Sequence, residues 1–385
     1  MKEKILRILS YALVAAGSTF MTLAMLHHQV DIIPCKLEEL ESLIDEKFVG
    51  EADAKTMEDA AAAAMVAAMG DRWSYYMSSE DYASHLEQMA NAYVGVGITI
   101  QKAEGDQGIR IIEVTPGGPA EEAGLQVEDL IVAVGDQDIR EMTNSEVRDL
   151  VKGPAGTFVD MTIRRGEETL ELSVERRMVE TPVATYAMLE EDIGLVTIEN
   201  FDSRCADETI AAIEALLGQG ARKLVFDVRH NPGGYADELV EVLDYLLPEG
   251  VVFRSENYNG KTDEERSDAA CLEIPMAVIV NSNSYSAAEF FAAALSEKDW
   301  AKVVGEQTSG KGYYQIMYRL ADGSAVGLSV GKYYTAEGKS LEGVGFTPNV
   351  TVPVDEQTAA SIYAGTLKPE EDPQIQAAIN ALKAQ

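Results

Sequence analysis

The spacing of apolar residues changes twice along the chain, first from helical to strand-like and then to an alternation of both. Between residues 31 and 92, apolar side chains recur every three or four positions. This predicts amphipathic helices over 36–48, from about 54 to 69 and from about 79 to 89. Asp53 or Thr56 could cap the second of these helices, and Gly70 ends it. We interpret this N-terminal helical region as packing or dimerisation helices.

Over residues 93–178, apolar and polar residues alternate as they do in half-buried strands. Strands are predicted over 94–101, 108–114, 130–134, 159–164 and 169–174, and short helices over 119–124 and 144–151. Five short strands with two helices predict a small module that has a core of its own.

From residue 179 to 352, strands alternate with helices. Strands are predicted over 193–198, 223–228 and 276–280, and helices over 206–217, 236–247 and 287–296. This order predicts a central sheet whose strand-end loops carry the site. Asp322-Gly323 is a hairpin turn signal, and 353–385 is expected to form a helical tail. We therefore expect a multidomain protein of the α/β and α+β classes.

The first residues have the pattern of a membrane anchor. Lys2, Lys4 and Arg7 precede an uncharged stretch, 8–26, which as a helix spans about 28 Å. We predict a signal anchor over residues 1–30 and an extracytoplasmic location, at a bacterial cell surface or in the periplasm, for the rest of the chain. A cleaved signal peptide, which gives a secreted protein, and a buried core helix are the alternatives.

Composition narrows the function classes. The 385 residues suffice for two or three domains, and the net charge of −34 repels phosphate backbones, so nucleic-acid binding is excluded. Cys35, Cys205 and Cys271 form neither a disulfide framework nor a metal spacing, although a Cys205–Cys271 bridge is left open. The four histidines lack a zinc spacing, so we expect no metal and no cofactor.

Two segments carry candidate chemistry. Ser286 stands between a buried strand and an alanine-rich helix, whose N-terminal N–H groups favour an oxyanion, although a serine here is also a common helix cap. Ser282 and Ser284 share the loop, so position alone does not choose among the three. Lys311 lies in a glycine-flanked turn. It acts as a base if burial lowers its pKa below the free value of about 10.4; otherwise it is an exposed loop lysine.

Other residues could support this pair. Gln315 falls on the same predicted strand face as Lys311 and could hydrogen-bond it. The N–H of Gly233 or Gly234, together with that of Ala287, could form an oxyanion hole, although the Asn231-Pro232-Gly233-Gly234 segment also fits a simple strand-to-helix turn. His230 lies beside this turn without a positioned carboxylate, so a serine-histidine triad is not favoured.

Within residues 93–178, short motifs follow one another in a recognisable order. They are Gly95-Val96-Gly97-Ile98, Pro119-Ala120, Ala123-Gly124-Leu125 and Asp129-Leu130-Ile131, with Val127-Glu128 where a glycine is usual. The set resembles a PDZ domain, in which the first motif is the carboxylate-binding loop. The resemblance implies a module that adds a peptide as an extra strand and binds its C-terminal carboxylate through backbone N–H groups.

Further motifs cover nearly the whole chain after the N-terminal stretch. They are GDRWSYY at 70–76, FDVRHNPGG at 226–234, KYYT at 332–335 and GVGFTPN at 343–349. With Ser286, Lys311 and Gln315, they are similar to the carboxyl-terminal processing peptidases, the PDZ-containing serine peptidases of the tail-specific protease family. The resemblance implies a crotonase-like mixed α/β core, Ser286 as nucleophile, Lys311 as base and Gln315 as its support. Asn283, Tyr285 and Ala288 depart from the family pattern, which bears on substrate preference and rate.

The resemblance implies a membrane-anchored serine endopeptidase that cleaves proteins near the C-terminus, after the PDZ domain has captured a free, apolar C-terminal tail. Protein substrates, the membrane and a second copy of the chain are the expected partners. An alternative of another class is a catalytically inactive, membrane-anchored scaffold that only binds peptides. A non-proteolytic, lipid-binding relative of the same core is a third interpretation.

Overall fold

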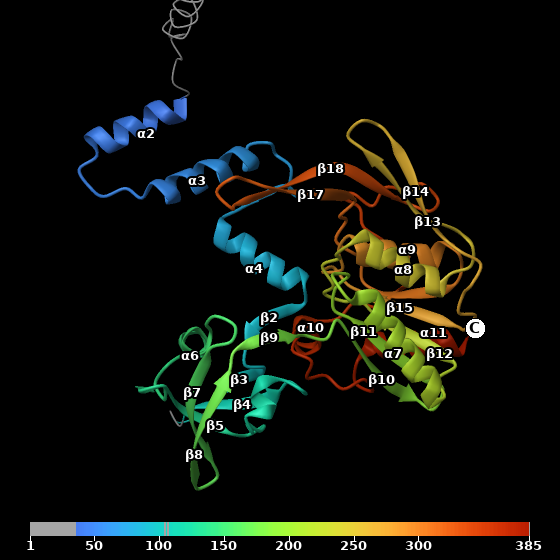
Figure 1. Ribbon diagram of the computed structural model, residues 1–385. Helices are drawn as coiled ribbons and strands as arrows, with labels where there is room; N and C mark the ends of the chain where they lie inside the picture. Colours follow the sequence, from blue (N-terminus) through green and yellow to red (C-terminus); the bar gives the residue numbers. More distant parts are fainter. Residues whose placement is uncertain (1–35, 104, 106–107, 385) are drawn as a thin grey trace, which may run out of the picture. The chain divides into compact units, whose positions relative to one another are not determined.

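The computed structural model describes residues 36–103, 105 and 108–384 (Figure 1). It divides into two compact units, one ending at Ala64 and one beginning at Met65. The anchor predicted over residues 1–30 lies outside the described residues. Among the helices that are described, none combines the length and apolar character needed to cross a membrane.

The N-terminal helices form where the apolar spacing predicts them. They are α2 (Lys36–Lys47), α3 (Ala54–Ala67) and α4 (Ser79–Met89). Asp53 is the cap of α3, because its Oδ1 accepts the Thr56 N–H at 2.7 Å. Ser78 caps α4 by accepting the Asp81 N–H.

The strands of the module over 93–178 form an antiparallel sheet in the order β3-β4-β5-β7-β8. Its elements are β3 (Ile98–Lys102), β4 (Ile109–Val114), β5 (Leu130–Val134), β6 (Gln137–Asp138), β7 (Phe158–Arg165), β8 (Glu168–Glu175), α5 (Pro119–Glu122) and α6 (Asn144–Val151). The single strand predicted over 94–101 is wrong. The chain turns at Gly97, where φ is 77°, and this separates β3 from β2 (Ala92–Gly95), which pairs with β9 (Arg177–Glu180).

The central sheet has the order β10-β11-β12-β15-β16-β19, parallel except for the pair β10–β11. Its strands are β10 (Ala184–Glu190), β11 (Ile193–Ile198), β12 (Lys223–Asp227), β15 (Met276–Val280), β16 (Ala301–Gly305) and β19 (Val350–Thr351). The expected multidomain mixed α/β class is confirmed.

Successive residues of these strands enter two different cores, as the two-residue period of a strand requires. Leu224 and Phe226 pack with α7 (Cys205–Gln219), α8 (Ala236–Leu246) and α9 (Ala287–Glu297). Val225 packs on the opposite face with α11 (Pro373–Lys383). Helices therefore cover both faces of the described sheet, which leaves the ends of its strands for a ligand site.

A second sheet has the order β1-β18-β13-β14, with β17 paired to β18. Its strands are β1 (Tyr75–Met77), β13 (Gly250–Asn257), β14 (Thr262–Ser267), β17 (Tyr313–Arg319) and β18 (Ala325–Thr335); α10 (Glu356–Tyr363) comes later in the chain. The predicted hairpin turn joins β17 to β18, with Gly323 at a φ of 94°.

Cys205 and Cys271 are free thiols, so the disulfide that the sequence left open is not formed.

Candidate active site

Three segments with candidate chemistry follow three neighbouring parallel strands. The glycine turn follows β12, the serine loop follows β15 and the lysine turn follows β16. Because the carboxyl ends of parallel strands meet at one edge of a sheet, this topology brings the segments together. They line a cavity of about 680 Å³, with Ser286, Lys311, Gln315, Gly233 and Gly234 in its wall.

Ser286 occupies a sharp turn between β15 and α9. Its φ of 50° and ψ of −117° are rare for a residue with a side chain and cost about 1–3 kcal/mol. Ser284 is fully buried, its Oγ donating to the Val228 carbonyl at 2.7 Å and accepting the Asn281 N–H. Ser282 is exposed and does not line the cavity. Of the three serines, only Ser286 therefore has a hydroxyl suited to chemistry in this cavity.

The buried carboxylate of Glu289 links the serine loop to the lysine turn. Its Oε2 accepts the N–H groups of Ser286 at 2.9 Å and of Lys311 at 2.8 Å. Its Oε1 accepts the Gly310 N–H at 2.8 Å and the Thr308 hydroxyl. Four donors thus share one fully buried carboxylate, which fixes the two loops relative to each other.

Lys311 is largely enclosed, and burial lowers the pKa of its amine from the ordinary lysine value, more than the charges of Glu289 and Glu342 raise it. Its Nζ lies 5.3 Å from the centre of the Trp73 ring. Trp73 is held in turn by a 2.9 Å hydrogen bond from its Nε1 to Glu342. A lysine with a lowered pKa is a better base near neutral pH, as the sequence hypothesis requires.

The glycine turn contacts the serine loop directly. A Cβ on Gly233 would lie 2.9 Å from the Ser286 Cβ, so only glycine fits there. The Gly233 N–H donates to Asn231 Oδ1 at 2.8 Å. In the described structure, the N–H groups of Gly234 and Ala287 have no protein acceptor. The second of the two candidate glycines, with Ala287, is therefore the better source of oxyanion donors.

Gln315 lines the cavity, but its amide donates to the Tyr313 carbonyl and to the Ser329 hydroxyl, each at 3.1 Å. The predicted hydrogen bond between Gln315 and Lys311 is not among those of the described residues. A register shift between Tyr314 and Gln315 interrupts the alternation on which that prediction relied.

His230 does not belong to this constellation. Its Nε2 lies 2.9 Å from the Asn281 amide nitrogen and its Nδ1 lies 3.2 Å from that of Asn283.

Sequence reasoning missed three other residues. His85 of α4 and Asp202 line the cavity, and Trp73 faces Lys311. Trp73 lies in the family motif at 70–76, which marked that segment as one to watch. Nothing in the sequence distinguished His85 or Asp202.

The four residues proposed as a carboxylate-binding loop lie together elsewhere. Gly95, Val96, Gly97 and Ile98 line a groove of about 280 Å³, beside Arg148 and Lys152 of the α6 region. β3 is an edge strand of its sheet, as peptide addition requires.

Within the described ranges, no cluster of three or more histidine, cysteine or acidic side chains has an arrangement that could hold a metal ion.

The Glu289 link predicts a stability effect. Glu289→Gln replaces an acceptor oxygen by an amide that cannot accept, leaving buried N–H groups unpaired, so the free energy of unfolding should fall by about 2–4 kcal/mol. Urea unfolding followed by tryptophan fluorescence measures this. Glu241→Gln, at an exposed position of α8, is the matched control and should unfold like the wild type. Equal stability of all three proteins would contradict the link.

Comparisons with known proteins agree on the family. The model of "Peptidase family S41" matches residues 192–352, and that of "PDZ domain" matches residues 110–165. A Bacteroides fragilis protein described as an S41 protease has a similar solved structure, with a TM-score of 0.57 and 20% identity over 87% of this chain and 92% of that one. That likeness supports the fold.

Two curated relatives are similar over most of the chain. "Carboxy-terminal processing protease CtpA" of Bacillus subtilis is 30% identical over 322 residues, 82% of this chain and 68% of the relative. "Probable CtpA-like serine protease" of Staphylococcus epidermidis is 28% identical over 321 residues, 82% of this chain and 65% of the relative. The chain thus spans about two thirds of the length of these relatives. With this identity, this coverage and both domain matches, the chain belongs to peptidase family S41 and is a serine peptidase of the carboxy-terminal processing protease type.

Proposed function

We propose that the chain is an endopeptidase in which Ser286 is the nucleophile and Lys311 is its general base. The observation that carries this proposal is the shared Glu289 carboxylate, which binds the backbone N–H groups of both residues at one cavity. The lowered pKa of Lys311 and the unusual backbone of Ser286 support it.

The reaction proceeds through an acyl-enzyme. Neutral Lys311 accepts the Ser286 proton as Oγ attacks the scissile carbonyl carbon, and the N–H groups of Gly234 and Ala287 stabilise the oxyanion. When the C–N bond breaks, protonated Lys311 gives its proton to the leaving amine. Water, deprotonated by Lys311, then attacks the ester carbonyl; as the C–Oγ bond breaks, Lys311 returns this proton to Ser286 Oγ and the carboxylic acid product leaves. Gln315 also lines this cavity, where its amide binds the Tyr313 carbonyl and the Ser329 hydroxyl.

The walls beside Ser286 support a preference for an apolar residue at the scissile bond. Next to Ser286 and Ala287 lies a narrow apolar slot of about 10 Å³, room for about one water, which has to widen to admit a side chain. It is lined by Gly234, Ala236, Leu239, Phe253, Phe290 and Tyr333. Such a slot excludes charged side chains because burying an unpaired charge is costly.

The groove next to β3 would capture the substrate's C-terminal tail. An extended peptide adds to the free edge of β3, its apolar side chain enters the groove at Val96 and Ile98, and its carboxylate meets the loop N–H groups. In this account 31–92 is a helical region, 93–178 the PDZ domain, 179–352 the peptidase core and 353–385 a helical tail. Association of two copies is also proposed, supported by the exposed Leu37, Leu40 and Leu43 of α2.

The N-terminal stretch completes the proposal. Its basic flank and uncharged core support an anchor that holds the peptidase outside the cytoplasm, where it would meet extracytoplasmic substrates.

Two variants test the catalytic pair. Ser286→Ala and Lys311→Met should each lower kcat on an unstructured protein with an apolar C-terminus by about 10⁴-fold or more, measured by the appearance of cleavage products. Lys311→Met should unfold at no lower temperature than the wild type, because it removes an amine whose charged form is disfavoured by burial.

Undiminished cleavage by either variant would contradict the assignment. If the wild type binds C-terminal peptides but cleaves none, the inactive-scaffold alternative holds instead.

The groove makes a separate prediction. A peptide with a free, apolar C-terminus should bind about tenfold more tightly than its C-terminal amide, because the amide removes a charged acceptor. Arg148→Glu should weaken binding of the free peptide, whereas Arg266→Glu, on β14, should not. Fluorescence anisotropy measures each affinity. Equal affinities for acid and amide would contradict carboxylate capture.

A further inference from the structure

The carboxylate of Asp202 is buried and incompletely paired. Only 8% of the residue is exposed, and its Oδ1 has no hydrogen-bond partner among the described residues. Buried polar atoms are almost always hydrogen-bonded, so such an atom calls for an explanation. None of the ion pairs in the described part of the chain includes Asp202.

Asp202 belongs to the catalytic cavity. It lines the same cavity as Ser286 and Lys311. Its segment runs beside the glycine turn, since the Phe201 N–H donates to the Gly233 carbonyl at 2.8 Å and the Tyr235 N–H donates to the Phe201 carbonyl at 2.7 Å. Because Gly233 is packed against Ser286, the Asp202 segment and the nucleophile contact the same glycine turn.

In the described part of the chain, no cation pairs with Asp202, although His85 and Lys311 line the same cavity. Glu238 of α8, the Tyr235 phenol and the Cys205 thiol are its titratable neighbours, and Tyr82 and His85 of α4 line the cavity. Glu238 is occupied, accepting the N–H groups of Arg204 and Ala206. Burial first, and then Glu238, raise the pKa of Asp202 to about 7.

We propose that Asp202 is a specificity-determining residue that binds a cationic side chain, lysine or arginine, of the peptide substrate. The inference rests on the proposed function. It concerns a residue flanking the scissile bond, since the slot at Leu239, Phe253 and Phe290 is proposed above to widen for an apolar one. A substrate ammonium or guanidinium would give the unpaired oxygen a charge-assisted hydrogen bond.

The test compares matched peptides. Each carries an apolar residue for the slot and either lysine or glutamine at one neighbouring position, scanned in turn, and kcat/KM is measured at pH 8. At one position, we expect the wild-type kcat/KM for the lysine peptide to be about tenfold that for the glutamine peptide. Asp202→Asn should reduce this lysine-to-glutamine ratio to about one. The wild-type ratio should also grow between pH 6 and pH 8, because the carboxyl ionises in that range and only the ionised form attracts a cation.

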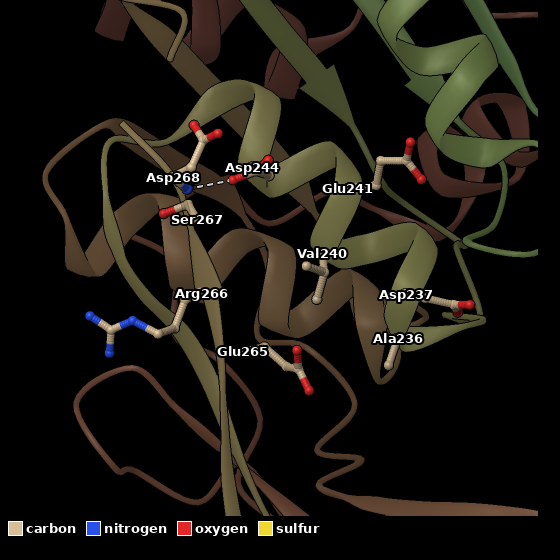
Figure 2. A pocket seen from close by; sticks show the side chains of 9 residues that line it. All are labelled: Ala236, Asp237, Val240, Glu241, Asp244, Glu265, Arg266, Ser267 and Asp268. Carbon is tan, nitrogen blue, oxygen red and sulfur yellow. Dashed lines mark hydrogen bonds between the residues drawn. The ribbon is translucent and has the colours of Figure 1, made fainter. Parts of the chain in front are cut away.

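A control separates a local contact from the general negative field of the protein. Glu241 lines a second, acidic cavity between α8 and β14, with Asp237, Asp244, Glu265 and Asp268 (Figure 2). Glu241→Gln removes the same charge there and should keep the lysine preference. Loss of the preference in this variant would overturn the proposal, as would a wild-type ratio near one at every position.

These failures are distinguishable from failure of the proposed function, because cleavage of the glutamine peptides reports the catalytic pair alone. The pH dependence of the wild-type ratio tests the proposal even if Asp202→Asn does not fold.

Discussion

The site depends on one buried carboxylate. Glu289 accepts hydrogen bonds from the backbones of Ser286, Gly310 and Lys311 and from the Thr308 side chain. It comes from the first turn of α9, whose packing in the core fixes its position. These hydrogen bonds hold the strained turn at Ser286 and the lysine turn after β16 together. Hydrogen bonds to a buried carboxylate stabilise the pair of turns by more than a single surface ion pair would.

The remaining parts of the site result from the topology. Three adjacent parallel strands end at the same edge, so a glycine turn, a serine and a lysine that lie far apart in the sequence share one cavity. The Trp73 ring covers the Lys311 amine. It also meets Tyr285 edge to face, with ring centres 6.4 Å apart, so Tyr285, which departs from the family pattern, contacts a residue of the N-terminal motif. Electrostatics and enclosure together set the basicity of Lys311.

Much of this was predictable because it obeys local rules. The buried runs at 193–198 and 276–280 are strands at those bounds, and Asp53, one of the two candidate caps of α3, is the one used. The hydrogen bond expected between Gln315 and Lys311 is not found among the described residues, because a register shift between Tyr314 and Gln315, which the sequence does not mark, breaks the alternation. The strands β13 and β14 were missed because their alternation is weak and many of their residues are half-buried or exposed. Asp202 was invisible because only the tertiary fold buries it.

The catalytic assignment depends on the activation of Ser286 by Lys311. The most direct test is the rate at which a serine-reactive phosphonate labels the protein as a function of pH, with the labelled residue identified by mass spectrometry. We expect a label on Ser286, a rate that rises with pH through one ionisation below the ordinary lysine value, and loss of labelling in Lys311→Met. A label on Ser282 or Ser284, or a pH-dependent rate that is unchanged in Lys311→Met, would contradict it.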